Sequence, residues 1–289
     1  MFVSFVVIIF LSCTTAPPVS KSSEPLISFA SIEDVVPQWL AFSEGIDYLH
    51  GKITAPRLEY HAIRINLFSS AIEIVVKGGA ASDDESVTLS TKVSSFVRDN
   101  ELIAGINASP FDITSSRERQ PIKNIGIVVS DGKLLSPVNK NFDAFVLYKD
   151  GSAAIVSQSS IESIEDIKNA VGGFRQILKN GELTQRAVQN ESRHPRSAVG
   201  ISADGRFMYL LVIDGRRSGS IGATEKETAV ILQTLGSFDG INLDGGGSSA
   251  LVLRYPDNTI KTVNRPIHNG IPGMERAVAG CIGILLNSY

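Results

Sequence analysis

The residues with the clearest chemical potential lie near the C-terminal end, where an apolar run leads to an acid and three glycines. Residues 240–243 are expected to form a strand that places Asp244 immediately before Gly245, Gly246 and Gly247. Glycine has no side chain, so its backbone reaches positive φ and its N–H groups can approach a ligand closely. The pattern therefore favours a site for an oxygen-rich or anionic ligand.

Three other interpretations of this stretch compete. A phosphate loop requires a lysine after its glycines, and Ser248 stands there instead. A serine-hydrolase elbow requires glycine two residues after the serine, and that position is Ala250. A glycine-rich turn that joins strand 240–243 to strand 250–253 stays open. The acid at the mouth of the turn favours a functional site over a plain turn.

The segment Asn242-Leu-Asp-Gly-Gly-Gly-Ser-Ser249 resembles the signature of the phosphodiester glycosidase family. Four further stretches resemble that family in the same order: Ala104-Gly-Ile-Asn-Ala-Ser109, His194-Pro-Arg-Ser-Ala-Val-Gly200, Val212-Ile-Asp-Gly-Arg216, and Asn264-Arg-Pro266 with Glu275-Arg-Ala-Val278. The resemblance runs from roughly residue 60 to the end. The first stretch departs from the family, whose members more often carry a glycine and two aromatics after the asparagine.

The resemblance implies hydrolysis of the bond between an anomeric carbon and a phosphodiester oxygen. Such a site needs a carboxylate near the anomeric carbon and cations that stabilise phosphate. Asp244 is the first candidate for nucleophile or base because it follows a rigid strand, although a turn-bracing role is the alternative. Asp214 ends the apolar run 209–213 and is the candidate second carboxylate, with an ordinary Asp-Gly turn equally open.

Arg196 and Arg216 are expected to bind phosphate as planar bidentate donors, with surface ion pairs as the alternative. Asn107 is expected to bind sugar hydroxyls or phosphate, unless it is a strand-end turn residue. Glu227 is expected to cap a helix, and it is the third catalytic candidate. The remaining candidates for substrate binding are Asn242, Gly245, Gly246, Gly247, Ser248, Asn264 and Arg276.

The elements that position these residues are expected to be strands joined by tight turns. An Asp-Gly or Asn-Gly pair follows each of the β-prone runs 124–130, 142–149, 175–179 and 197–202, which is typical of hairpins. Helices are predicted at 91–99, 163–170 and 224–235, the last with a capping box from Thr224 to Glu227. These patterns predict an α+β fold: one domain with a mixed, mostly antiparallel, hairpin-rich sheet flanked by helices.

The N-terminus has the pattern of an export signal. Residues 2–11 form an apolar run that is too short to span a membrane, and residues 10–13 resemble a relaxed bacterial lipobox. We therefore predict a signal peptide over 1–13 with lipid attached to Cys13, a Thr-, Pro- and Ser-rich linker over 14–25, and a folded domain over 26–289. No Lys or Arg precedes residue 21, so an upstream start or a buried N-terminal strand stays open.

Composition narrows the possible partners. The chain has 289 residues with 27 basic and 30 acidic side chains, a net charge of −3, which gives no basic footprint for nucleic acid. Cys281 lies in an apolar run and is expected to be buried. The four histidines, His50, His61, His194 and His268, lack the short spacing of a catalytic zinc site. No cofactor is predicted, and a divalent cation on Asp and Asn oxygens stays open.

These observations predict an exported, lipid-anchored hydrolase of the bacterial cell envelope. Its expected substrate is a sugar-1-phosphodiester, similar to an N-acetylglucosamine-1-phosphodiester, within an envelope glycan or exopolysaccharide. The alternative is a non-catalytic envelope module that binds glycan through the same glycine loop. Paired acids with a phosphate clamp favour the enzyme, because simple sugar binding requires neither.

Overall fold

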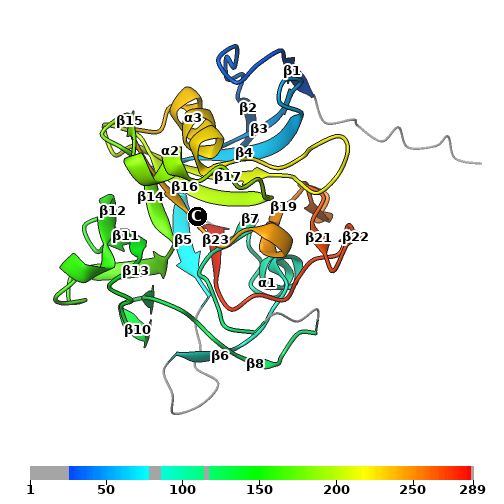
Figure 1. Cartoon of the computed structure of the whole chain (residues 1–289). Helices are drawn as coiled ribbons and strands as arrows, with labels where there is room; N and C mark the ends of the chain where they lie inside the picture. Colours follow the sequence, from blue (N-terminus) through cyan, green and yellow to red (C-terminus); the bar gives the residue numbers. More distant parts are fainter. Residues whose placement is uncertain (1–25, 78–85, 114–116, 288–289) are drawn as a thin grey trace, which may run out of the picture.

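The computed structural model describes residues 26–77, 86–113 and 117–287, and strands dominate them (Figure 1). The largest sheet has nine strands. Their order is β1 (Ile27–Phe29), β3 (Ile46–Ile53), β4 (Leu58–Asn66), β17 (Phe207–Ile213), β16 (Arg196–Ile201), β18 (Asp239–Asn242), β14 (Arg175–Lys179) and β15 (Glu182–Leu183), while β2 (Leu40–Ser43) pairs with β3. The pairs are antiparallel apart from β1 with β3.

Two five-stranded sheets and two short ladders complete the strands. One sheet has the order β10 (Lys133–Ser136), β9 (Val128–Ser130), β13 (Ile167–Gly172), β11 (Asp143–Tyr148) and β12 (Ala153–Ser157). The other has the order β20 (Ile260–Thr262), β19 (Leu251–Arg254), β7 (Ala104–Asn107), β23 (Cys281–Leu286) and β5 (Ile72–Val76). The short ladders pair β21 (Ile267–His268) with β22 (Ile271–Pro272) and β6 (Val87–Leu89) with β8 (Pro121–Lys123).

Helical segments are few among the described residues. The α-helices are α1 (Val93–Asp99), α2 (Gln185–Gln189) and α3 (Glu225–Leu235), and single 3₁₀ turns span η1 (Gln158–Ser160) and η2 (Gly246–Ser248). The fold is therefore mostly β, and the predicted α+β fold with helices flanking the sheet is supported only in part. Within the described ranges, no helix is both long and apolar enough to cross a membrane.

The large sheet buries both of its faces. Along β17, Met208, Leu210 and Val212 enter a core shared with the two five-stranded sheets, whereas Leu211 and Ile213 enter a second core that α3 covers. This alternation follows from the two-residue period of a strand. Figure 1 shows α2 and α3 on one side of the large sheet and the five-stranded sheets on the other.

All four predicted hairpins are confirmed: β9 with β10, β11 with β12, β14 with β15, and β16 with β17. At the turn between β14 and β15, Asn180 and Gly181 have φ values of 51° and 76°. Two consecutive positive φ values are the geometry that favours an Asn-Gly pair. Local turn chemistry was thus a sufficient guide to these connections.

Two of the three predicted helices are confirmed, and one is wrong. Helices α1 and α3 fall inside the predicted ranges 91–99 and 224–235, and α3 begins with the predicted capping box. The second half of the predicted helix 163–170 is instead the start of β13, which pairs with both β9 and β11, and its first half is not helical. Those two ladders bond the β13 backbone from both sides, which outweighs the weak helical spacing of a short segment. The predicted signal peptide, Cys13 and the linker lie outside the described residues.

Candidate active site

Asp244 lies just beyond the end of β18, in a cleft of about 210 Å³. Strand β18 is held between β16 and β14, so the chain reaches this point from the interior of the large sheet. The Asp244 N–H donates to the Ala108 carbonyl at 3.1 Å, and Asn107 Nδ2 donates to the Asp244 carbonyl at 2.6 Å. The backbone of Asp244 therefore continues from β18 of the large sheet and is hydrogen-bonded to residues at the end of β7 in a five-stranded sheet.

The Asp244 carboxylate is poorly solvated. Its Oδ2 atom is buried and makes no hydrogen bond to any described residue. Burial raises the pKa of Asp244 to about 6, while the Ser248 hydroxyl, the Arg276 charge and the Gly245 N–H act in the opposite direction. A strongly shifted carboxyl group in a cleft is the signature of a functional acid or base.

The three glycines are explained by what packs against them. A Cβ atom on Gly246 would lie 2.9 Å from Arg216 Nη2, and one on Gly247 would lie 2.6 Å from Arg276 Nη2. A Cβ atom on Gly245 would lie 2.8 Å from the Pro195 carbonyl oxygen. The absent side chains thus let two guanidinium groups approach the backbone beside Asp244. The Gly246 N–H is not free for a ligand, because it donates to the Pro195 carbonyl at 2.8 Å.

Arg216 and Arg276 carry the positive charge of the cleft. Arg216 is exposed, and its Nη1 donates to the Ile267 carbonyl in a long hydrogen bond of 3.3 Å. Arg276 donates from Nη1 to Ser248 Oγ and from Nε to His268 Nδ1, both at 3.2 Å. These contacts orient Arg276 toward the glycine loop. Both guanidinium groups line the same cleft as Asp244.

Arg196 lines the cleft, but its guanidinium group already interacts with other residues of the protein. Nε donates to the Ala223 carbonyl at 2.9 Å, and Nη2 donates to the Ser192 carbonyl at 2.7 Å. Nη1 lies 3.7 Å from Glu225 Oε1, and only 6% of the residue is exposed. These contacts favour a structural role in holding the loop 194–196 over a direct role in binding phosphate.

Asp214, the candidate second carboxylate, does not line the cleft. It is buried, and its Oδ2 accepts from Arg217 Nη2 at 2.7 Å. Its Oδ1 accepts from Asn264 Nδ2 at 3.1 Å and from the Arg265 N–H at 3.0 Å. Asn264 also donates to the Ser249 carbonyl at 3.0 Å, directly after the glycine loop. Asp214 therefore stabilises the glycine loop 245–247 indirectly, through Asn264, and takes no part in lining the cleft.

Three polar residues predicted to bind substrate differ in whether they line the cleft: Asn107, Asn242 and Ser248. Asn107 is fully buried, and its Oδ1 accepts from Ser197 Oγ at 2.7 Å, so it positions the Asp244 backbone and has no surface for a sugar. Asn242 lines the cleft, and its buried Oδ1 has no hydrogen bond within the described residues. Ser248 is buried beside Arg276.

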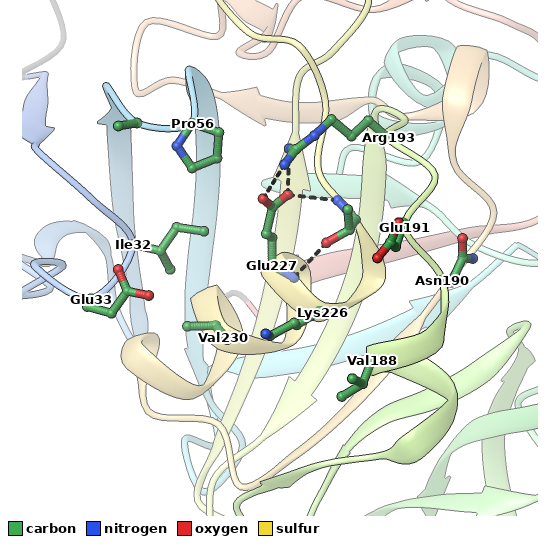
Figure 2. A pocket seen from close by; sticks show the side chains of 12 residues that line it. Ile32, Glu33, Pro56, Val188, Asn190, Glu191, Arg193, Lys226, Glu227 and Val230 are labelled. Carbon is green, nitrogen blue, oxygen red and sulfur yellow. Dashed lines mark hydrogen bonds and ion pairs between the residues drawn. The ribbon is translucent and has the colours of Figure 1, made fainter.

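Glu227 lies in a different and larger pocket of about 620 Å³, shown in Figure 2. Its Oε2 accepts from the Thr224 N–H at 2.9 Å, and its two oxygens accept from Arg193 at 2.6 and 2.7 Å. The capping role is confirmed, and the carboxylate is saturated. The carboxylate that the sequence predicted as catalytic is thus occupied by its cap and by Arg193, so the smaller cleft at Asp244 is the better candidate site.

Sequence reasoning missed three side chains at or beside the cleft: His194, His268 and Phe174. His194 and Phe174 line the cleft, and His268 supports Arg276 from behind it. Burial, with the charges of Arg196 and Arg216, lowers the pKa of His194. Phe174 follows Gly173, where a Cβ atom would lie 2.7 Å from Ile241 Cδ1. The Gly172-Gly173 pair was the available signal for Phe174, although alone it indicated only a turn.

Comparisons with known proteins show which family and which proteins this chain resembles. The family model described as phosphodiester glycosidase matches residues 100–285. The SPbeta prophage-derived uncharacterized protein YomE of Bacillus subtilis (strain 168) is 25% identical over 205 residues, which cover 66% of this chain and 29% of that protein. The chain thus spans well under half the length of this relative.

Solved structures share the fold. A hypothetical protein from Synechocystis matches with a TM-score of 0.65 and 16% identity, over 88% of this chain and 64% of that chain. The catalytic domain of zebrafish N-acetylglucosamine-1-phosphodiester alpha-N-acetylglucosaminidase, auto-inhibited by its pro-peptide, matches with a TM-score of 0.62 and 20% identity. That match covers 89% of this chain and 87% of the zebrafish chain. At these identities, the structural matches support the fold alone.

Proposed function

The chain belongs to the phosphodiester glycosidase family, and from that premise we propose that it hydrolyses the glycosidic bond of a sugar-1-phosphodiester. The products would be a free sugar and a phosphomonoester. One observation carries the proposal: a desolvated carboxylate, Asp244, shares a small cleft with the guanidinium groups of Arg216 and Arg276. This arrangement pairs a negative group for the sugar carbon with positive groups for the phosphate.

In the proposed mechanism, Asp244 is ionised above about pH 6 and acts on the anomeric carbon as nucleophile, or on water as base. Of the described residues that line the cleft, Asp244 is the only carboxylate. A phosphodiester is already a weak base, so its departure requires little help from a general acid. One carboxylate is therefore sufficient where ordinary glycoside cleavage uses a pair.

The arginines would stabilise the charge that develops on the leaving phosphate. Arg216 is the more exposed of the two, and its planar fork suits bidentate contact with phosphate oxygens. Ser248 and His268 hold Arg276 in place. We assign the phosphate clamp to Arg216 and Arg276, with Arg196 as a support for the loop 194–196.

The test is incubation of the purified protein with a synthetic N-acetylglucosamine-1-phosphodiester. Release of free sugar, lost in Asp244→Asn and retained in Glu227→Gln, is the expected result. The matched substrate is an N-acetylglucosaminide with a neutral leaving group, which should be cleaved far more slowly. Binding without turnover would replace the enzyme with the non-catalytic glycan-binding module.

The proposed setting is the bacterial cell envelope, where an exported, lipid-anchored enzyme would act on envelope glycan or exopolysaccharide. The sequence of the N-terminus supports this, since residues 2–11 are apolar and Cys13 follows a small residue. Cys13→Ser should move the protein from the membrane fraction to the soluble exported fraction with unchanged turnover. Persistent membrane association of this variant would contradict the lipid anchor.

A further inference from the structure

A second cluster of polar side chains lies on the hairpin of β3 and β4, outside the Asp244 cleft. His50 on β3 pairs directly with His61 on β4. Glu59 is two residues from His61, so the three side chains share one face of the sheet. One ligand atom from each residue lies within 4.8 Å of the others. Two imidazoles and one carboxylate are a donor set that binds zinc in proteins.

The contacts around this cluster resemble the outer support of a metal site. Tyr48 Oη lies 2.7 Å from His61 Nδ1, which leaves Nε2 as the nitrogen for a ligand. Arg217 Nη2 donates to Glu59 Oε2 at 2.6 Å and leaves Oε1 facing His50 Nε2 at 2.9 Å. Partners of this kind fix the orientation of metal-binding side chains.

Two further observations concern the hydrogen bonding and charge of this cluster. His50 Nδ1 is buried and makes no hydrogen bond within the described residues, and buried polar atoms are rarely left without a partner. Arg217 bridges two carboxylates, those of Glu59 and Asp214. Glu59 also faces His50 at 2.9 Å, an ion pair when that imidazole is protonated, and a bound cation would supply the positive charge in place of that proton.

We propose that His50, Glu59 and His61 form a binding site for a divalent transition-metal ion of the zinc class, with water completing its coordination. The His50 and His61 rings are stacked with centroids 4.1 Å apart and planes 17° apart, so one ring must turn for both nitrogens to face the same ion. Turning the His50 ring would exchange its 2.9 Å contact with Glu59 Oε1 for a bond to the ion. The bound ion would cross-link β3 and β4 beside the Arg217–Asp214 pair that braces the glycine loop.

Titration of the full chain, without a polyhistidine tag and after treatment with a chelator, tests the proposal. Calorimetry with Zn²⁺ should show one ion per chain, and His50→Ala and Glu59→Gln should each weaken binding at least ~10-fold. His194→Ala removes a histidine outside the cluster and should bind Zn²⁺ like the wild type. The absence of stoichiometric binding, or equal affinity in His50→Ala, would overturn the site.

A second measurement keeps the test independent of enzyme activity. Zn²⁺ should raise the melting temperature of the wild type and of His194→Ala, since a ligand that binds the folded state stabilises it. The rise should vanish in His50→Ala and in Glu59→Gln, whose folding circular dichroism checks. Ca²⁺ and Mg²⁺ prefer oxygen ligands and should produce no comparable rise. An equal effect of Ca²⁺ would contradict a site built from imidazoles.

Discussion

Asp244→Asn should make the protein both less active and more stable at neutral pH. The amide keeps the shape of the side chain but removes a charge that the site desolvates. Burial raises the pKa of Asp244 from 3.8 to about 6, a difference of about 2. At 1.36 kcal/mol per pKa unit, the charged form destabilises the fold by about 3 kcal/mol. The asparagine variant avoids this destabilisation.

The sign of the effect depends on pH. A carboxyl group with a raised pKa in the folded state contributes stability below pH 3.8 and loses that contribution as the pH rises through about 6. The gain from Asp244→Asn should therefore be small at pH 4 and approach its full size by pH 7.5. Urea unfolding at several pH values measures it.

Turnover is measured on the same samples, and kcat should fall ~100-fold or more, the scale of losing a general base or nucleophile. Asp214→Asn is the control for a buried carboxylate, and it should lower stability because Arg217 loses a partner. A variant of Asp244 that is no more stable than the wild type at pH 7.5 would refute the desolvation argument. Full activity in that variant would refute the catalytic role.

Three further outcomes are expected from the same geometry. Gly247→Ala should reduce kcat/KM ~100-fold by displacing Arg276, as measured by sugar release. Gly151→Ala meets no atom within 4 Å but is strained at a φ of 86°, so it is the control for a destabilising glycine substitution that displaces no arginine. Arg216→Lys should raise KM about 10-fold, because lysine keeps the charge but loses the bidentate hydrogen bonds of the guanidinium group. The melting temperature should not change, because Arg216 is exposed. Glu227→Gln should lower stability by about 1 kcal/mol through its cap and leave kcat unchanged, so a large fall in kcat would return Glu227 to the active site.

The parts of the fold that the sequence predicted are those set by local chemistry. The Asn180-Gly181 turn and the capping box at Thr224 each depend on a few neighbouring residues, so a short pattern was sufficient. The segment that became β13 depends on two distant strands, which no local pattern contains. Helix and strand remained ambiguous there for that reason.

In the candidate site, too, local patterns were predicted from the sequence, whereas contacts between distant residues were not. Asp214 and Asp244 each follow an apolar strand and precede glycine, so their sequences alone gave them similar roles. Their partners separate them: Arg217 saturates Asp214, whereas Asp244 retains an unpaired oxygen in the cleft. His50 and His61 are eleven positions apart in sequence, and only the register of the hairpin makes them neighbours.

The position of β23 has a consequence for how the chain reaches its folded state. Residues 281–286 lie between β7 and β5, which come from the first half of the sequence and have no ladder to each other. During synthesis, β5 and β7 cannot pair with β23 until residue 286 has been made. Closing such a distant pairing is slow, and it leaves apolar edges accessible in the meantime. The unfinished chain should therefore depend on chaperones, and removal of residues 281–286 should yield aggregation rather than a smaller folded protein.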